Sequence, residues 1–180
     1  MIEQINQAAA AVHSLSCDFT QTKESRLLKE PIVSTGHFYY TDRDQLRWEY
    51  QQPYPYCLMI DGQKIQIVSG DKSETIDMQK SMTAKRIAQV VMKGAKGKFL
   101  DDRQNFDVEM QVNGTDWTAV LTPKQSKMKR LFVKAEICFD TKQQMMTRMT
   151  LYEKSGDKTT IVLSNIQKNV ALDAQLFSTK

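Results

Sequence analysis

Apolar and polar side chains alternate along most of the chain, which is the pattern of β-strands with one face turned toward an apolar environment. In residues 45–52, Leu46, Trp48 and Tyr50 occupy every second position, with polar side chains between them. Because successive side chains of a strand point to opposite faces, these three share one face. Equivalent patterns predict strands over residues 14–24, 33–41, 45–52, 56–60, 64–70, 73–77, 106–112, 117–123, 131–140, 145–154 and 159–169.

Glycines mark the turns between these strands. The dipeptides Asp61-Gly62 and Asn113-Gly114 stand between alternating segments, where they favour the positive φ angles of a tight hairpin. Gly36 lies inside a predicted strand, which indicates a bulge or a close approach of another part of the backbone. Strands this short and regularly spaced predict an antiparallel meander, and a sheet of about ten or eleven strands tends to curl into a barrel or half-barrel.

Two segments have helical periodicity instead. Residues 2–13 place apolar side chains at helical spacing, and residues 82–93 do so with Ile87 and Val91 on the apolar stripe and basic side chains outside it. The predicted fold class is therefore mainly β (α+β), with an N-terminal helix and one helix in the middle of the chain. At 180 residues, we expect a single domain over residues 1–180.

Composition excludes several classes of function. The formal charge of +4 comes from 25 basic and 21 acidic residues scattered along the chain, so we expect no binding to nucleic acid. No apolar run has the roughly 18 residues of a membrane-spanning helix. The first residues lack the apolar core of a signal peptide, which is consistent either with a cytoplasmic protein or with a mature chain whose signal has been replaced by Met1.

Side chains that could support catalysis are few. His13 and His37 lack the spacing of a metal site, and neither a phosphate-binding loop nor a nucleophile elbow is present, so we expect no enzyme activity, no metal and no cofactor. Cys17, Cys57 and Cys138 are odd in number. We interpret them as isolated thiols packed among strands. A disulfide joining Cys17 to Cys57, or Cys57 to Cys138, is the alternative.

The apolar strand faces are the main candidate for a binding site. They could simply be the core of a barrel, as most apolar stripes are. However, large aromatic side chains crowd strands for which the sequence offers two short helices as cover, and the ten methionines provide side chains that adapt to variable ligands. Both interpretations stay open on the pattern alone.

Several short motifs resemble the LolA family of lipoprotein carriers, in the wider group of LolA- and LolB-like proteins. The matching pieces run in the family's order along nearly the whole chain: DFTQTK at 18–23, GHFYYTDRDQLRWEY at 36–50, Pro53, IDGQKI at 60–65, LTPK at 121–124 and ALDAQLF at 171–177. Each piece is short, but the run from 36 to 65 is moderately specific as a set.

The resemblance implies an incomplete antiparallel barrel whose apolar cavity is covered by a helical lid. It implies a periplasmic, monomeric carrier that takes acylated lipoproteins from an inner-membrane ABC transporter to an outer-membrane acceptor. The implied lid residues are Ile87 and Val91. Together with the strand pattern, the resemblance gives these acyl-binding residues: Phe38, Tyr40, Leu46, Trp48, Tyr50, Leu58, Ile60, Ile65, Ile67, Met110 and Trp117.

One departure from the family pattern concerns the lid. The family has an arginine directly before a proline ahead of the strand at 45–52, and this arginine helps to hold the lid closed. Here those positions are Asp42 and Arg43, and no proline follows Arg43. Either Arg43 replaces the latch from a neighbouring position, or the lid closes by packing alone.

Other functions on a similar fold remain alternatives. They are a LolB-like outer-membrane receptor, a periplasmic stress-sensing regulator and a carrier of another lipid. An enzyme acting on lipids in the same cavity would need a nucleophile beside an imidazole.

Overall fold

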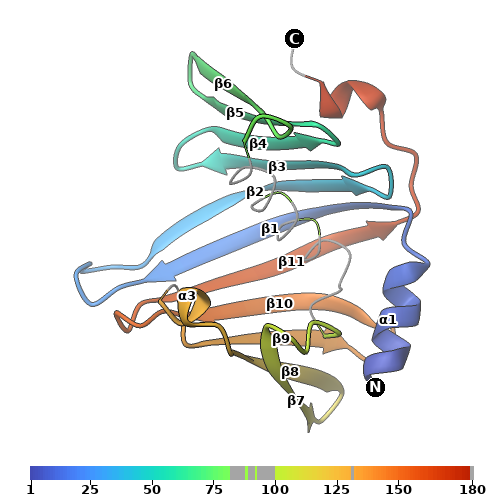
Figure 1. Cartoon of the computed structure of the whole chain (residues 1–180), viewed down its shortest axis with the longest axis vertical. Helices are drawn as coiled ribbons and strands as arrows, with labels where there is room; N and C mark the ends of the chain where they lie inside the picture. Colours follow the sequence, from blue (N-terminus) through green and yellow to red (C-terminus); the bar gives the residue numbers. More distant parts are fainter. Residues whose placement is uncertain (82–87, 89–91, 93–99, 131, 179–180) are drawn as a thin grey trace. The chain divides into compact units, whose positions relative to one another are not determined.

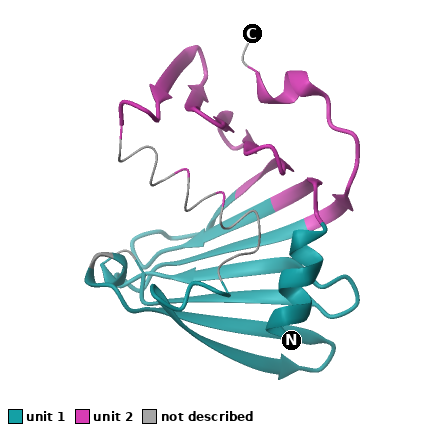
Figure 2. Cartoon of the chain, turned by 45° about the vertical axis from the view of Figure 1, so that its right-hand side comes forward, with its two compact units in different colours: residues 1–11, 20–33, 97–163 teal, residues 12–19, 34–96, 164–180 magenta. Residues whose placement is uncertain are grey.

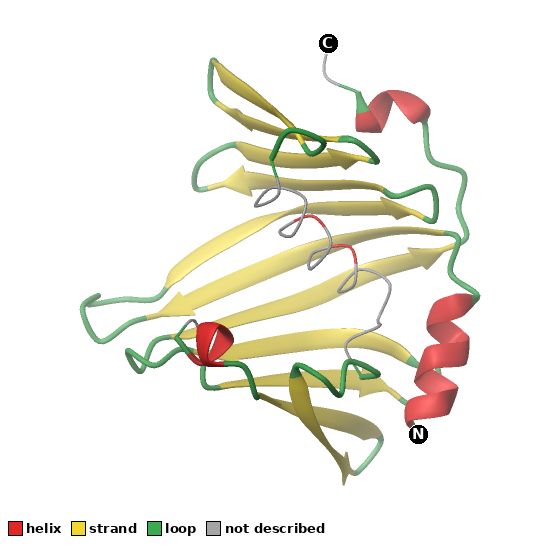
Figure 3. Cartoon of the chain, viewed as in Figure 1, coloured by secondary structure: helices red, strands yellow, loops and turns green. Residues whose placement is uncertain are grey.

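The computed structural model describes residues 1–81, 88, 92, 100–130 and 132–178 (Figure 1). Within them the chain is mainly β, as predicted (Figure 3). The strands are β1 (Ser14–Glu24), β2 (Ile32–Thr41), β3 (Gln45–Gln52), β4 (Tyr56–Asp61), β5 (Lys64–Ser69), β6 (Lys72–Asp77), β7 (Phe106–Asn113), β8 (Asp116–Pro123), β9 (Lys134–Asp140), β10 (Met145–Tyr152) and β11 (Lys158–Lys168). The helical elements are α1 (Ile2–Ala10), α3 (Ser126–Lys129) and the 3-10 turn η1 (Ala174–Phe177).

The strands form one open sheet with the order β6-β5-β4-β3-β2-β1-β11-β10-β9-β8-β7. The strand pairs with a described register are antiparallel. The first and last strands of this order do not pair with each other, so the sheet is not closed into a barrel. The prediction of about ten or eleven antiparallel strands in a sheet that does not close is confirmed.

The predicted mid-chain helical lid is not shown. Ile87 and Val91 lie outside the described residues, and in the segment from 82 to 99 the structure describes Ala88 and Met92. Both of these side chains are buried. The lid therefore stays a prediction.

The chain divides into two compact units, each of which combines distant parts of the sequence (Figure 2). Unit 1 comprises residues 1–11, 20–33 and 97–163. Its core is formed by Ile5 of α1, by Leu100 in the segment before β7, and by side chains of the strands, namely Phe106, Ala119, Leu121, Ala135, Ile137 and Phe139. Helix α1 ends at Ala10, three residues earlier than predicted. The backbone N–H of His13, which already belongs to unit 2, donates to Oδ1 of Asn169 in the same unit.

Unit 2 comprises residues 12–19, 34–96 and 164–180. It contains β3 to β6, β2 from Ser34 onward, the first part of β1, the last part of β11 and the C-terminal turn η1. The turn begins at Asp173, whose carboxylate accepts a hydrogen bond from the backbone N–H of Gln175 at 2.9 Å. Neither η1 nor α3 was predicted, because each is a single turn and too short to show a helical period.

The predicted turns and the bulge are present. Gly62 and Gly114 adopt φ angles of 43° and 61°, a conformation that glycine reaches without the steric cost of a Cβ. At Gly36 the register between β2 and β3 shifts, and an added Cβ would overlap the carbonyl oxygen of Glu49. Both consequences expected of this glycine, a bulge and a close backbone approach, are therefore found together.

Candidate functional site

Nine of the predicted acyl-binding residues lie on one face of β2, β3, β4 and β5 in unit 2. Trp48 pairs with Phe38 on β2 and with Leu58 on β4, and Leu58 pairs in turn with Ile67 on β5. Because directly paired residues point to the same side of a sheet, the register places these side chains in one row across four strands. A second row contains Tyr40, Leu46, Ile60 and Ile65. Tyr50 follows Trp48 by two residues and therefore lies on the same face of β3. It completes the set, which we call the apolar face.

An aromatic cluster lies at one end of the apolar face. The Phe19 ring packs edge-on against Trp48 and Tyr50, with ring centroids 5.8 and 4.9 Å apart. Phe38 packs edge-on against Trp48 at 5.9 Å, and the Trp48 and Tyr50 rings are stacked at 6.1 Å. Phe19 is 2% exposed and was missed as a site residue, although it occupies an apolar position in the alternation of β1. These contacts hold the rings in fixed orientations.

Burial differs between the two rows of the apolar face. Tyr40, Leu46, Ile60 and Ile65 are buried, at 3% exposure or less. Phe38, Trp48, Tyr50, Leu58 and Ile67 are only partly covered. The Nε1 atom of Trp48 is buried and has no hydrogen-bond acceptor among the described residues. The side chains of the row centred on Trp48 are thus partly accessible, whereas those of the other row are buried.

Met110 and Trp117 belong to unit 1 and not to this set. Both pack as partly buried side chains against the hydrophobic core cluster of unit 1. The structure therefore brings together nine of the eleven predicted acyl-binding residues, and their role in binding stays a prediction. Arg43 is exposed in the turn between β2 and β3, and its part in a lid latch also stays a prediction.

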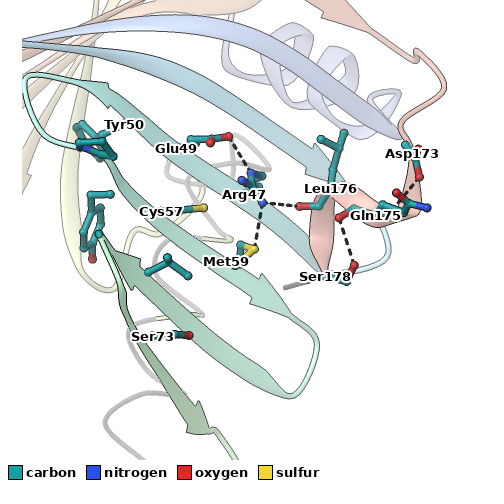
Figure 4. A pocket seen from close by; sticks show the side chains of 14 residues that line it. Arg47, Glu49, Tyr50, Cys57, Met59, Ser73, Asp173, Gln175, Leu176 and Ser178 are labelled. Atoms are coloured by element: carbon teal, nitrogen blue, oxygen red, sulfur yellow. Dashed lines mark hydrogen bonds and ion pairs between the residues drawn. The ribbon is translucent and has the colours of Figure 1, made fainter. Parts of the chain in front are cut away.

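A cavity of about 630 Å³ lies on the opposite face of β3 and β4, beneath the C-terminal segment (Figure 4). Arg47 is central to its polar side, since Nε donates to Glu49 at 2.9 Å and a terminal nitrogen donates to the Leu176 carbonyl at 3.1 Å. The same guanidinium lies 3.4 Å from the sulfur of Met59. Of the predicted site residues that the structure describes, Tyr50 alone lines this cavity; the other lining residues are Arg47, Glu49, Pro55, Tyr56, Cys57, Met59, Val68, Gly70, Ser73, Asp173, Gln175, Leu176 and Ser178.

This second covered face was not predicted. The alternating pattern of β3 and β4 gave no indication of a cover on the side opposite the apolar face, yet Met59 is 2% exposed there. Cys57 is 7% exposed on the same side, in agreement with the expectation of a packed thiol. Two charged residues, Arg47 and Glu49, lie on this face, and charged residues are typical of a solvated surface. Here they lie beneath a cover because they form an ion pair with each other. Their hydrogen bond is the main cause that lowers the pKa of Glu49.

The three cysteines are free and buried, which confirms the interpretation as isolated thiols. Burial raises the pKa of Cys17 to about 12 and that of Cys57 to about 11. A thiol with so high a pKa is almost fully protonated at neutral pH and is a poor nucleophile. Neither side chain is therefore suited to catalysis.

A polar cluster joins β1, β2 and β11 within unit 2. Asp18 accepts hydrogen bonds from Asn165 and contacts His37 Nδ1, each at 2.6 Å. These contacts, that of Asn165 foremost, lower the pKa of the Asp18 carboxyl. Because about two fifths of the Asp18 side chain is exposed, the cluster resembles a surface network more than a buried catalytic pair.

The described part of the chain contains no group of three or more His, Cys, Asp or Glu side chains that could hold a metal ion. None of its helices is long and apolar enough to cross a bilayer.

A continuous apolar face on an open antiparallel sheet, with packed aromatic rings, is typical of a protein that binds apolar ligands. Residues 10–180 match the family model of the outer membrane lipoprotein carrier protein LolA, and the chain belongs to this family. The members of this family are lipoprotein carriers and not enzymes.

Curated relatives agree with this assignment, and solved structures share the fold. The chain is 25% identical to the outer-membrane lipoprotein carrier protein of Dechloromonas aromatica and 26% identical to that of Ralstonia nicotianae, covering 98% of this chain and 81% of each relative. An uncharacterised conserved protein of Thermus thermophilus has a similar fold, with a TM-score of 0.62 and 10% identity over 99% of this chain and 93% of that one. A chain of the Pseudomonas aeruginosa MucA/MucB complex gives a TM-score of 0.52 at 10% identity, over 99% of this chain and 59% of that one.

Proposed function

We propose that this protein is a periplasmic carrier that holds the acyl chains of lipoproteins against the apolar face of unit 2. The observation that carries the proposal is the row of partly covered side chains centred on Trp48, which the sheet register aligns across four strands. The family assignment supports a lipoprotein as the cargo. The carrier would act as a monomer, without metal or cofactor.

A carrier must release what it binds, and the size of the hydrophobic effect makes this demanding. Burial of one methylene group contributes about 0.8 kcal/mol, so a fully buried sixteen-carbon chain would gain roughly 12 kcal/mol. A lid that occupies the empty site offsets part of this gain, because the ligand must displace it. Ile87 and Val91 are the proposed lid residues, and Arg43 is the proposed latch.

The route between membranes is the finer part of the proposal. An inner-membrane ABC transporter would load the cargo, and an outer-membrane acceptor would take it up. The relatives named as outer-membrane lipoprotein carriers support this route. A carrier of another lipid, a LolB-like receptor and a stress-sensing regulator are the alternatives.

Substitution on the apolar face tests the site. Trp48→Ala removes a ring of about 200 Å² from the acyl site, and we expect about 10- to 100-fold weaker binding of a fluorescent fatty-acyl probe. Leu58→Glu, which places a charge in the same row, should weaken binding at least as much. The measurement is a fluorescence titration, with circular dichroism to verify that the strands persist.

Tyr54→Ala is the matched control, because Tyr54 is an aromatic residue of unit 2 that is 80% exposed between β3 and β4. It should bind the probe like the unsubstituted protein. Equal affinity of the Trp48→Ala and Tyr54→Ala proteins would refute the proposed site. Probe binding without binding of a triacylated lipoprotein would indicate a carrier of another lipid.

A further inference from the structure

Three connections between strands meet at one end of unit 1 (Figure 1). The backbone N–H of Val133 donates to the Tyr152 carbonyl at 2.8 Å, which joins the β8–β9 connection to the end of β10. The ion pair of Lys158 with Glu24, at 2.9 Å, joins the start of β11 to the end of β1. We call this region the strand-end surface; it comprises residues 23–33, 124–130, 132–134 and 153–158.

Large apolar side chains project from the strand-end surface. Leu27, at the tip of the β1–β2 hairpin, is 94% exposed, and its neighbour Leu28 is 41% exposed. Ile32, Val33 and Val133 are 45%, 52% and 46% exposed. Isolated apolar residues are common on protein surfaces, but five exposed apolar side chains at one end of a unit indicate an interaction surface.

The same surface holds an excess of positive charge. Leaving out Lys127, whose side chain is not described, it has nine Lys and Arg residues against four Asp and Glu, whereas the whole chain has 25 against 21. Four of the nine are ion-paired, namely Lys23, Lys124, Lys134 and Lys158. Among the described residues the remaining five form no ion pair: Arg26, Lys29, Lys129, Arg130 and Lys154. Two of these, Arg26 and Lys29, directly flank the exposed leucines.

We infer that the strand-end surface docks on an anionic lipid bilayer, with Leu27 and Leu28 entering the boundary between head groups and acyl chains. Leucines on a hairpin tip with lysine and arginine on either side match the chemistry of such a boundary, where apolar insertion and attraction to anionic lipid add together. A protein partner fits less well, because protein interfaces are enriched in aromatic residues and depleted of lysine. The inference rests on surface residues of unit 1 and does not require the acyl site.

Flotation of the whole protein with lipid vesicles tests this inference. We expect it to float with vesicles of phosphatidylcholine mixed with phosphatidylglycerol and not with phosphatidylcholine alone, and we expect high salt to reduce binding. Arg26→Glu combined with Lys29→Glu should weaken binding by more than about twentyfold, since each cation near such a surface contributes about fivefold. Leu27→Ser combined with Leu28→Ser should weaken it by about tenfold or more.

Matched controls come from strand ends of unit 1 that lie outside the strand-end surface. Val112→Ser changes an exposed apolar residue of β7, and Lys142→Glu reverses an exposed charge between β9 and β10. Both should bind vesicles like the unsubstituted protein. No binding to anionic vesicles, equal binding to phosphatidylcholine alone, or equal losses in the control variants would overturn the inference.

Two further readouts distinguish docking on a bilayer from binding to an acidic polypeptide and from binding of acyl chains. Binding to soluble polyglutamate without binding to vesicles would assign the surface to an acidic polypeptide and would likewise overturn the inference. The hairpin variants should retain affinity for the fatty-acyl probe, so failure of the docking inference and failure of the proposed acyl site are distinguishable.

Discussion

Gly36 shows how one residue determines the packing of the apolar face. Its missing side chain leaves space for the Glu49 carbonyl and for the Phe19 ring, whose Cε1 atom would lie 2.9 Å from an added Cβ. The Phe19 ring in turn contacts Trp48 and Tyr50. The close approach at Gly36 is thus directly linked to the aromatic cluster.

Gly36→Ala should therefore destabilise the protein by about 1–3 kcal/mol or more, because the new methyl group overlaps backbone that cannot move without disrupting the β2–β3 pairing. Urea unfolding measures the change. Gly62→Asn is the control, since an added Cβ there meets open space and asparagine tolerates a positive φ. A Gly36→Ala protein as stable as the Gly62→Asn protein would contradict the close approach as the reason for this glycine.

Arg47 connects the C-terminal turn η1 to strand β3. The guanidinium binds the Leu176 carbonyl and also pairs with Glu49, and the cavity below η1 is lined by Cys57. Burial is the largest cause of the high pKa of Cys57. The reactivity of this thiol therefore reports whether η1 remains in place.

Arg47→Ala should increase the rate at which Cys57 reacts with a thiol reagent at mildly alkaline pH by about tenfold, because loss of a charged hydrogen bond worth about 1.5–3 kcal/mol frees η1 and exposes the sulfur. Burial is the largest cause of the raised pKa of Cys57, so its relief outweighs the loss of the Arg47 charge, which by itself lowers that pKa. Deletion of residues 174–180 should have the same effect while keeping Arg47. Peptide mass spectrometry identifies the labelled cysteine. Arg43→Ala, which changes an exposed arginine in the turn before β3, should leave the rate unchanged; a similar rate in all variants would show that η1 does not protect Cys57.

The strand bounds could be predicted from the sequence pattern, but contacts between distant segments could not. Alternation and glycine turns are local signals, so the strands at 14–24 and 45–52 were predicted at their observed bounds. The cover over Cys57 and Met59 depends on a segment more than a hundred residues away, and no local pattern indicates it. Phe19 was overlooked for the same reason, since its importance comes from its contacts with rings on β3.

The protein has two surfaces that differ in chemical character, one apolar and one basic. Unit 2 presents an apolar face whose ligand we propose to be acyl chains, and unit 1 presents a basic strand-end surface that we infer to dock on lipid. The first was predictable from alternation, because its side chains follow one another at every second position. The second was not, since its charges come from three connections that are distant in sequence.

The chain has two tryptophans, and each lies in a different unit, Trp48 in unit 2 and Trp117 in unit 1. Trp117→Phe therefore leaves Trp48 as the single indole, and Trp48→Phe leaves Trp117. Bromine atoms on an acyl chain quench tryptophan fluorescence at short range. Quenching by a brominated fatty acid thus locates the bound chain directly.

We predict that the brominated acyl chain quenches Trp48 in the Trp117→Phe protein, with the non-brominated acid as the control that leaves its emission unquenched. Additional quenching of Trp117 would extend the site to Met110 and Trp117. Bound acyl chain that quenches Trp117 alone, or neither tryptophan, would contradict the apolar face of unit 2 as the acyl-binding site.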